Sequence, residues 1–325
     1  MSLFAEAWSI RAEGVTLDKT VYEGFFAYRL SDGKTEAIIV PSVGRVLRYG
    51  LVGGDNFLWN APTGNPSIIK RHGMGGDKTW LGPQSLWPLL FGRLFPPDPA
   101  WDAPQHAEVL PGPKLHLTGA VSSAGVRITR EYSIDADGGL IIVQTAEKVR
   151  GYPMLLAIWS DTQIAPGDAV YLPVNPQSVY KGNFCWMSPP KRKVVLNTIS
   201  DGCIEVRPEF STTASNFYKI GVDARVASLA VARKGVAFLQ HSARPSGDYA
   251  DSVAGGGLAA QYFHHGHKDS LLHYDELELL SPLYPFRVGA HWTHIVRWSL
   301  HKLPSRDANF PQTRKFIESL VESPQ

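Results

Sequence analysis

The sequence predicts an all-β protein built from antiparallel sheets, and three features support this prediction. Pro (24 residues) and Gly (30 residues) interrupt the chain at short intervals. The runs between them have strand length and are rich in Val, Ile, Leu, Tyr and Thr, whereas helical periodicity is scarce. Residues 31–34 and 136–139 have turn sequences between two such runs, which is typical of antiparallel hairpins.

The individual elements follow from the same patterns. A helix is expected at the C-terminal end, over residues 311–321, where Phe316, Leu320 and Val321 can form an apolar stripe after a Pro start. Residues 85–90 form a weaker helix candidate. The clearest predicted strands are residues 36–40, 126–134, 140–149, 154–164, 228–240 and 292–300.

Two long stretches, residues 62–113 and 245–268, have no such pattern and are interpreted as irregular loops. Loops of this length commonly build a site or move. Since no linker, low-complexity tract or internal repeat divides the chain, we expect one domain over residues 1–325.

The composition excludes several classes of partner. Lys and Arg (32) nearly balance Asp and Glu (30), and no run of basic residues has the form of a nucleic-acid-binding stripe, so no nucleic acid is expected. No stretch of about 18 apolar residues is found, which argues against a membrane partner. Charged residues near the N-terminus interrupt any secretory signal, which favours a cytoplasmic protein. The oligomeric state is left open.

The chain has two cysteines, Cys185 and Cys203, with no CxxC pair, so neither a zinc site nor a disulfide framework is indicated. A single disulfide between them stays possible from the sequence. Motifs for a Ser or Cys nucleophile and for phosphate-binding glycine loops are missing, and no cofactor is expected.

The first long loop combines aromatic rings with planar polar groups, as sugar-binding sites do. Sugars stack C–H faces on Trp and need paired donors and acceptors for their hydroxyls. The alternative is that these tryptophans are ordinary core anchors. The candidate ligand-binding residues in this loop are Asp77, Lys78, Trp80, Gln84, Trp87 and Arg93.

Residues 274–282 resemble an alternating strand that places Glu276 and Glu278 on one face. Two neighbouring carboxylates in a cleft raise each other's pKa and provide a general base. The alternative is a solvent-exposed strand face with two ordinary glutamates.

Histidines group only at residues 264–267 and at His291 and His294. Residues three apart on a strand point to opposite faces, so His291 and His294 are not expected to share a metal. Residues 264–267 are interpreted as a solvated loop, and no metal is expected.

The order of several motifs resembles the galactose mutarotase superfamily, which includes the aldose 1-epimerases. Residues 40–46 (VPSVGRV) followed by residues 56–59 (NFLW) resemble its first hairpin, and residues 277–282 with residues 294–300 resemble its closing strands. Residues 75–84 and 95–99 look closest to an uncharacterised bacterial branch, a domain of unknown function. The resemblance implies a galactose mutarotase-like β-supersandwich that binds a small carbohydrate.

In mutarotases a His on a central strand protonates the ring oxygen, while a Glu near the C-terminus removes the proton of the anomeric hydroxyl. Glu278 matches that Glu, and Glu276 is the second candidate. The strand that should carry the His has Trp159 and Asp161 instead. A buried Asp161 beside Glu278 would have a raised pKa and could serve as the proton donor.

Three functions therefore compete. The first is a sugar mutarotase or epimerase with Glu278 as base. The second is a non-catalytic sugar-binding or sensing protein that keeps Lys78 and the rings of Trp80, Trp87 and Trp159. The third is a lyase or hydrolase on acidic sugars, in which Lys78, Arg93 and Lys219 would neutralise a carboxylate.

Overall fold

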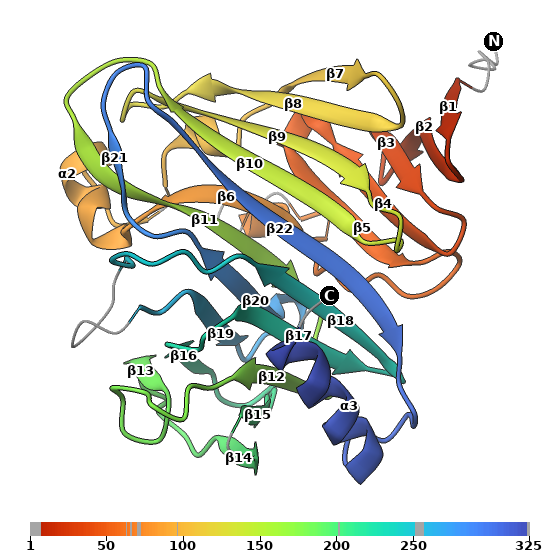
Figure 1. Cartoon of the computed structure of the whole chain (residues 1–325), viewed down its shortest axis with the longest axis vertical. Coiled ribbons are helices and arrows are strands. Elements are labelled where there is room, and N and C mark those ends of the chain that lie inside the picture. The colour runs from red at the N-terminus through yellow and green to blue at the C-terminus, as the bar shows by residue number, and fades with distance from the viewer. Residues whose placement is uncertain are drawn as a thin grey trace.

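The computed structural model describes residues 8–62, 64–65, 67–69, 73–95, 97–200, 202–250 and 257–323. In this part of the chain, the strands form two antiparallel sheets that pack face to face (Figure 1). The all-β antiparallel prediction is confirmed.

The first sheet has twelve strands within the described residues, and its central strands are distant in sequence. β21 (Tyr284–Phe286) pairs with one of them, β11, outside the main order. That order is β1 (Ser9–Ala12), β2 (Val15–Tyr22), β3 (Phe25–Ser31), β4 (Thr35–Val40), β5 (Arg45–Leu51), β6 (Asp77–Gly82), β11 (Met154–Ile164), β20 (His273–Leu280), β19 (Ala260–Gly266), β16 (Asn216–Val222) and β13 (Cys185–Ser188).

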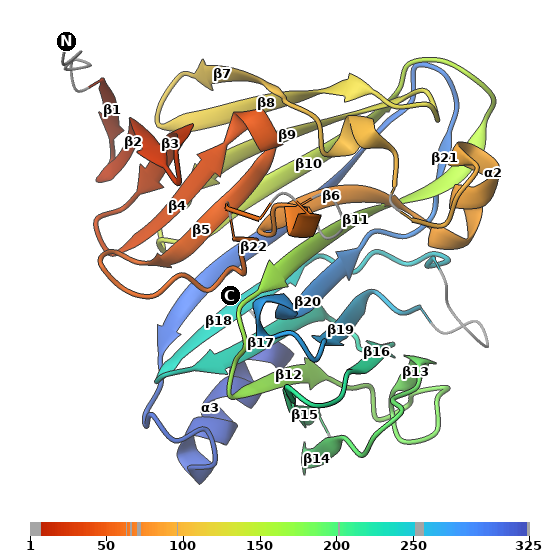
Figure 2. The same ribbon diagram turned by 180° about the vertical axis from the view of Figure 1, so that it is seen from behind.

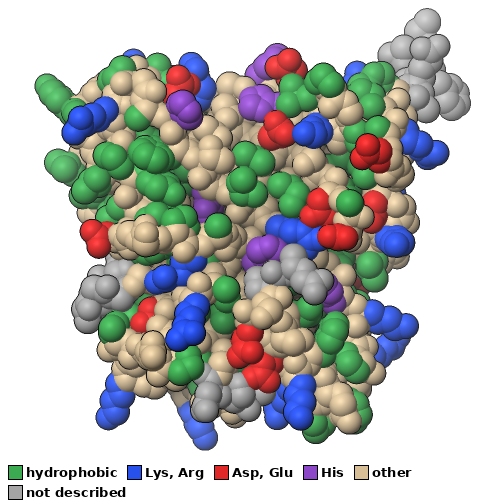
Figure 3. Space-filling model, viewed as in Figure 1, with side chains coloured by type: hydrophobic (Ala, Val, Ile, Leu, Met, Phe, Trp, Pro, Cys, Tyr) green, Lys and Arg blue, Asp and Glu red, His purple; other side chains and the backbone are tan. Residues whose placement is uncertain are grey.

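The second sheet has ten strands within the same residues and faces the viewer in Figure 1. The space-filling view of that side shows basic and acidic side chains interspersed, without a basic stripe (Figure 3). Its order is β14 (Val195–Ser200), β15 (Cys203–Arg207), β12 (Ala169–Pro173), β17 (Ala227–Arg233), β18 (Val236–Ser242), β22 (His291–Lys302), β10 (Leu140–Lys148), β9 (Val126–Ile134), β8 (Lys114–Val121) and β7 (His106–Leu110).

Apart from the C-terminal helix, the helical turns are short and lie in the connections. The C-terminal helix α3 (Pro311–Glu322) packs Ile317 and Val321 on the outer side of the second sheet. None of the described helices is both long and apolar enough to cross a membrane. Further helical turns include η1 (Pro41–Val43), η2 (Gln84–Leu86), α2 (Trp87–Phe91), η3 (Pro99–Trp101) and η4 (Ser270–Leu272).

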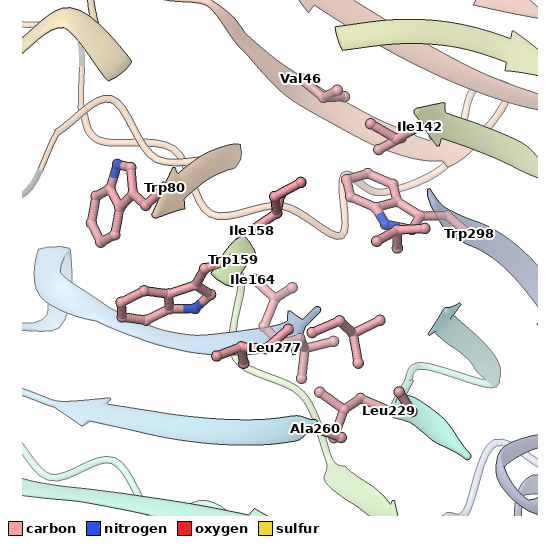
Figure 4. Packing of buried hydrophobic residues seen from close by; sticks show 14 of the residues in the cluster. Val46, Trp80, Ile142, Ile158, Trp159, Ile164, Leu229, Ala260, Leu277 and Trp298 are labelled. Atoms are coloured by element: carbon pink, nitrogen blue, oxygen red, sulfur yellow. The ribbon is translucent and has the colours of Figure 1, made fainter. Parts of the chain in front are cut away.

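The main core fills the space between the sheets. Alternate residues of β9 and β10 are buried, as their sequence patterns predict. Figure 4 shows Ile158 of the first sheet beside Ile142 and Trp298 of the second. Burying such side chains supplies most of the driving force for folding, at roughly 25 cal/mol per Å² of apolar surface.

A seam of buried polar groups also joins the sheets. Asp77 of β6 accepts a hydrogen bond from Thr162 of β11 (2.8 Å) and forms an ion pair with Arg130 of β9 (3.4 Å). Gln240 of β18 donates to the same Thr162 hydroxyl (2.9 Å). Because Asp77 and Arg130 are both essentially unexposed, each charge depends on the other for its burial.

The predicted strands, both hairpin turns and the C-terminal helix are confirmed, with three corrections. Residues 228–240 form two strands, β17 and β18, because Lys234 and Gly235 turn the chain with positive φ (49° and 85°). The first supposed loop contains β6 and β7, and the second contains β19; residues 251–256 lie outside the described residues.

The two cysteines are not paired. Both are buried free thiols, Cys185 in β13 of the first sheet and Cys203 in β15 of the second. The single disulfide that the sequence left open is therefore not formed.

Candidate functional site

A cleft of about 1160 Å³ lies on the face of the first sheet that points away from the core. Its floor is formed by β6, β11, β20, β19 and β16, which Figure 2 shows side by side. The walls are formed by η1 with the start of β5, by the loop that contains Leu94 and Phe95, and by β13.

Gly75 and Gly76 allow β6 to begin beside its neighbours. Both have positive φ (85° and 69°). A Cβ atom would lie 2.2 Å from the Trp59 carbonyl oxygen at Gly75, and 2.1 Å from the Val46 carbonyl oxygen at Gly76. Only glycine fits both requirements, so this pair fixes where Lys78 and Trp80 enter the floor.

Strand register places the candidate side chains in rows across the floor. One row contains Lys78, Asp161 and Glu278, because Asp161 is paired with Lys78 on one side and Glu278 on the other. The next row contains Gln163 and Glu276, which are paired with each other. Glu276 and Glu278 therefore share one face of β20, as predicted, and both line the cleft.

Lys78 is the centre of the first charged group. Its Nζ atom lies 2.8 Å from Asp161 Oδ2 and donates to Glu276 Oε1 (3.2 Å). Gln163 donates to the same Glu276 oxygen (3.0 Å). Burial alone would lower the pKa of Lys78, yet the two carboxylates raise it, so Lys78 stays charged.

Asp161 is fully buried beneath this group and does not line the cleft. Its burial, and next the charge of Glu276, raise its pKa well above the ordinary value of 3.8, against the lowering effect of Lys78. The raised pKa expected from the sequence is thus present, but the carboxyl group faces Lys78 and not the open cleft.

Glu278 and Lys219 form the second charged group. Lys219 reaches from β16 and donates to Glu278 Oε2 at 2.7 Å. Burial raises the pKa of Glu278 above 4.5, although Lys219 opposes this rise. The Glu278 side chain is 1% exposed and that of Lys219 17%, so the pair lies at the bottom of the cleft with the ammonium group more accessible.

Two tryptophans hold these ammonium groups. Lys78 lies 4.4 Å from the ring centroid of Trp80, and Lys219 lies 4.8 Å from that of Trp159. The two rings meet edge to face with centroids 5.7 Å apart (Figure 4), and both line the cleft. Such contacts favour the charged form of lysine at a desolvated site.

Not every predicted ligand-binding residue reaches the cleft. Gln84 lines it, as do Trp80, Trp159 and Lys219, whereas Lys78 is buried and is not part of the lining. Asp77 points to the opposite face of β6, into the core, because adjacent residues on a strand face opposite sides. Trp87 is fully buried behind Trp80 and donates its Nε1 hydrogen to the Leu81 carbonyl oxygen (2.8 Å).

Arg93 also lies away from the lining. It is exposed, and its guanidinium donates to the Pro97 carbonyl oxygen (3.4 Å).

Arg45 was not predicted, although it lies in the VPSVGRV motif. It lines the cleft, donates to the Gly75 carbonyl oxygen (2.8 Å), and forms an ion pair with Asp102 at 2.6 Å.

Residues 264–267 are not a solvated loop, because His264 and His265 belong to β19. His264 is buried on the core side, with Nδ1 2.7 Å from Asp275. His265 lines the cleft and stacks on Tyr274 (4.2 Å between ring centroids). Its Nδ1 donates to the Leu272 carbonyl oxygen (2.9 Å), and burial lowers its pKa, so the ring is neutral at pH 7.

The described residues contain no group of three or more His, Cys, Asp or Glu side chains arranged to hold a metal ion. The alternation of His264 and His265 on β19, with one side chain on each side of the sheet, explains why these neighbouring histidines do not converge. The expectation that no metal or cofactor is used stays a prediction.

The fold is that of galactose mutarotase-like proteins. A galactose mutarotase-like protein from Clostridium acetobutylicum matches with a TM-score of 0.57 and 10% identity, over 90% of this chain and 100% of that one. Another, from Lactobacillus casei, matches with a TM-score of 0.53 and 10% identity, over 85% of this chain and 100% of that one. No family model and no curated protein matches the sequence. At this identity the likeness shows the fold alone.

Proposed function

We propose that the cleft binds a sugar and exchanges its anomers, with Glu278 as the general base. The observation that carries this proposal is the environment of Glu278: a carboxylate that lines the cleft, is almost fully buried, and is held at 2.7 Å by Lys219. The motif resemblance matches Glu278 to the base of the mutarotases, and the shared fold supports the same position.

The floor offers the groups that a pyranose requires. Trp80 and Trp159 line the cleft and provide apolar surface for C–H groups. Glu276 accepts hydrogen bonds from Lys78 and Gln163 and retains acceptor sites for sugar hydroxyls. A cleft with mostly apolar walls and a few convergent polar groups is the usual form of a small-molecule site.

Anomer exchange begins when a base removes the proton of the anomeric hydroxyl, which opens the ring as the ring oxygen is protonated. Burial raises the pKa of Glu278, which makes it a stronger base than an exposed glutamate, while the neighbouring Lys219 ammonium favours its ionised form. We therefore expect exchange to fall on acidification, with a midpoint above the ordinary value of 4.5.

Asp161 has a different role in this proposal from the one that the sequence suggested. It does not line the cleft, so it does not reach the ring oxygen. Its contact with Lys78 at 2.8 Å suits it to position that ammonium group, which in turn orients Glu276. We expect Asp161→Asn to keep anomer exchange within about tenfold.

Non-catalytic sugar binding is the second candidate, because the cleft has the binding groups whether or not a proton donor is in place. A lyase or hydrolase on acidic sugars is less well supported. Lys78 and Lys219 are each paired with carboxylates, so a substrate carboxylate would have to compete for them, and Arg93 lies off the cleft lining.

The test is anomer exchange, measured by NMR saturation transfer on a panel of free aldoses. We expect exchange above the buffer rate for at least one sugar, and a loss of 10²- to 10⁴-fold in Glu278→Gln, which is the usual contribution of a general base. Glu108→Gln, the same change at an exposed position of β7, is the control. Saturable binding without exchange by the wild type would favour the non-catalytic candidate.

A further inference from the structure

We propose that Lys219 is the general acid that works with Glu278, so that one ammonium–carboxylate couple carries both proton transfers. This inference rests on the proposed function and assigns its missing proton donor. The contact that suggests it is the 2.7 Å hydrogen bond from Lys219 Nζ to Glu278 Oε2, with both residues lining the cleft.

The geometry suits the reaction. In a pyranose the anomeric oxygen and the ring oxygen are bonded to the same carbon, so the base and the acid must act at two neighbouring points. Lys219 and Glu278 come from β16 and β20, which flank β19, and their polar ends meet at the cleft floor. A couple of this size can contact both oxygens without any movement of the sheet.

The other candidate acids in the described residues fit less well. Asp161 is fully buried and off the lining. His265 is neutral at pH 7, because burial lowers its pKa and Nδ1 donates to a carbonyl oxygen. Lys78 is 2% exposed and held between Asp161 and Glu276, whereas Lys219 is 17% exposed and has the cleft in front of it.

Glu278 and Lys219 together account for both proton transfers of ring opening. The Glu278 carboxylate takes the proton of the anomeric hydroxyl, the C–O bond between the anomeric carbon and the ring oxygen breaks, and the ring oxygen takes a proton from the Lys219 ammonium. The open-chain aldehyde is then bound beside a neutral amine and a carboxylic acid. Rotation about the bond to the aldehyde carbon and reversal of the transfers closes the ring to the other anomer and restores both charges.

Trp159 keeps the ammonium group in place for this cycle. Lys219 lies over its ring at 4.8 Å, and this contact does not use any of the three N–H donors. One donor is directed to Glu278, and the others are available to a ligand in the cleft.

The experiment uses Lys219→Ala with small amines added back. We expect anomer exchange to fall by 10²- to 10⁴-fold, while sugar binding, followed by tryptophan fluorescence, changes much less. Ammonium and methylammonium should restore exchange, in a manner that follows their acid strength. Tetramethylammonium, which has a charge but no proton to give, should not. Lys181→Ala, an exposed lysine, is the control.

Lys219→Arg provides a second readout if the alanine variant folds poorly. It keeps a positive charge beside Glu278 but is not deprotonated in proteins, so it should bind sugar and fail to exchange it. Rescue by tetramethylammonium equal to that by methylammonium would overturn the inference, because the charge alone would then suffice. Exchange within threefold of the wild type in Lys219→Ala or Lys219→Arg would also overturn it.

These outcomes are distinct from a failure of the proposed function. If the wild type exchanges no sugar, the mutarotase proposal itself fails, and the role of Lys219 fails with it. If the wild type exchanges, Glu278→Gln does not, and the Lys219 variants do, only the assignment of the acid is wrong.

Discussion

Replacing Lys78 with Met tests how strongly the buried charges beneath the cleft depend on one another. The substitution keeps the length of the side chain but removes the ammonium group that lies 2.8 Å from Asp161. Both side chains are buried, at 2% and 0% exposure. Asp161 would then be a buried carboxylate beside Glu276 without its neutralising partner.

The magnitude follows from the distance. Two unit charges 2.8 Å apart attract by about 6 kcal/mol at an effective dielectric constant of about 20. Much of that attraction offsets the desolvation of both groups, and removal of one partner of a buried pair typically costs ~3–5 kcal/mol. We expect Lys78→Met to lose that much unfolding free energy at pH 7.

The double variant Lys78→Met/Asp161→Asn separates the charge from the packing. It has no unpaired charge at position 161, so it should recover most of the loss and remain within ~1–2 kcal/mol of the wild type. Urea unfolding followed by the fluorescence of the tryptophans measures all three proteins on one scale.

The pH dependence provides an independent check. In Lys78→Met the folded-state pKa of Asp161, already raised by burial, should rise further. The resulting loss of unfolding free energy is fully present above that pKa and absent below the unfolded value of 3.8. The difference in unfolding free energy between Lys78→Met and the wild type should therefore decrease as the pH falls from 7 towards 4. Equal losses in the single and double variants, or a gap independent of pH, would refute the reasoning.

Two further predictions concern stability. Burial lowers the pKa of His294 from 6.5 to about 4, so the folded state binds this proton less readily than the unfolded state. The unfolding free energy should therefore fall by ~3 kcal/mol as the pH drops from 6.5 to 4. His294→Gln should lack this pH dependence in urea titrations at several pH values. Ile317→Ala removes a fully buried side chain of α3 from the second sheet and should cost ~2–5 kcal/mol in thermal or urea unfolding, whereas Lys315→Ala on the same helix should cost less than 1.

The sequence predicted strands best where only one face of the sheet is buried. β9 and β10 alternate because one face packs on the core and the other is partly exposed, so period two is visible in the letters. The sequence predicts a loop at β6 because all six of its residues are buried: one face contacts the core and the other forms part of the cleft floor. A strand buried on both faces has no alternation to detect.

The same point explains which site residues could be predicted. Glu276 and Glu278 were placed on one face of a strand from spacing alone, and the register confirms it. Asp77 was grouped with Lys78 because β6 was not recognised as a strand, and strand geometry separates the two to opposite faces. His265 was missed because its cluster was interpreted as a solvated loop, although residues 260–263 (AQYF) lead directly into it.

The sequence of one strand does not indicate which residues of other strands its side chains will contact. Lys219 and Glu278 are 59 residues apart, and nothing in either segment indicates that β19 alone separates them. Register depends on how the core faces of three strands align, which is a property of the packed sheet. The resemblance singled out Glu278 as the candidate base, whereas its partner Lys219 could be identified only from the fold.

This dependence on register also gives a physical reading of the departure at Trp159. By resemblance, the strand that contains Trp159 should contribute an imidazole that donates a proton. An indole has no such proton at neutral pH, but it has a larger π face, and Lys219 lies over it at 4.8 Å. Under the proposal for Lys219, an indole in place of an imidazole on this strand would remove one proton donor and support another. On that argument, Trp159 on β11 and Lys219 on β16 act together. Trp159→His would introduce a second acid but would also remove the ring that holds the Lys219 ammonium group. We therefore do not expect Trp159→His to recreate a working mutarotase pair of acid and base.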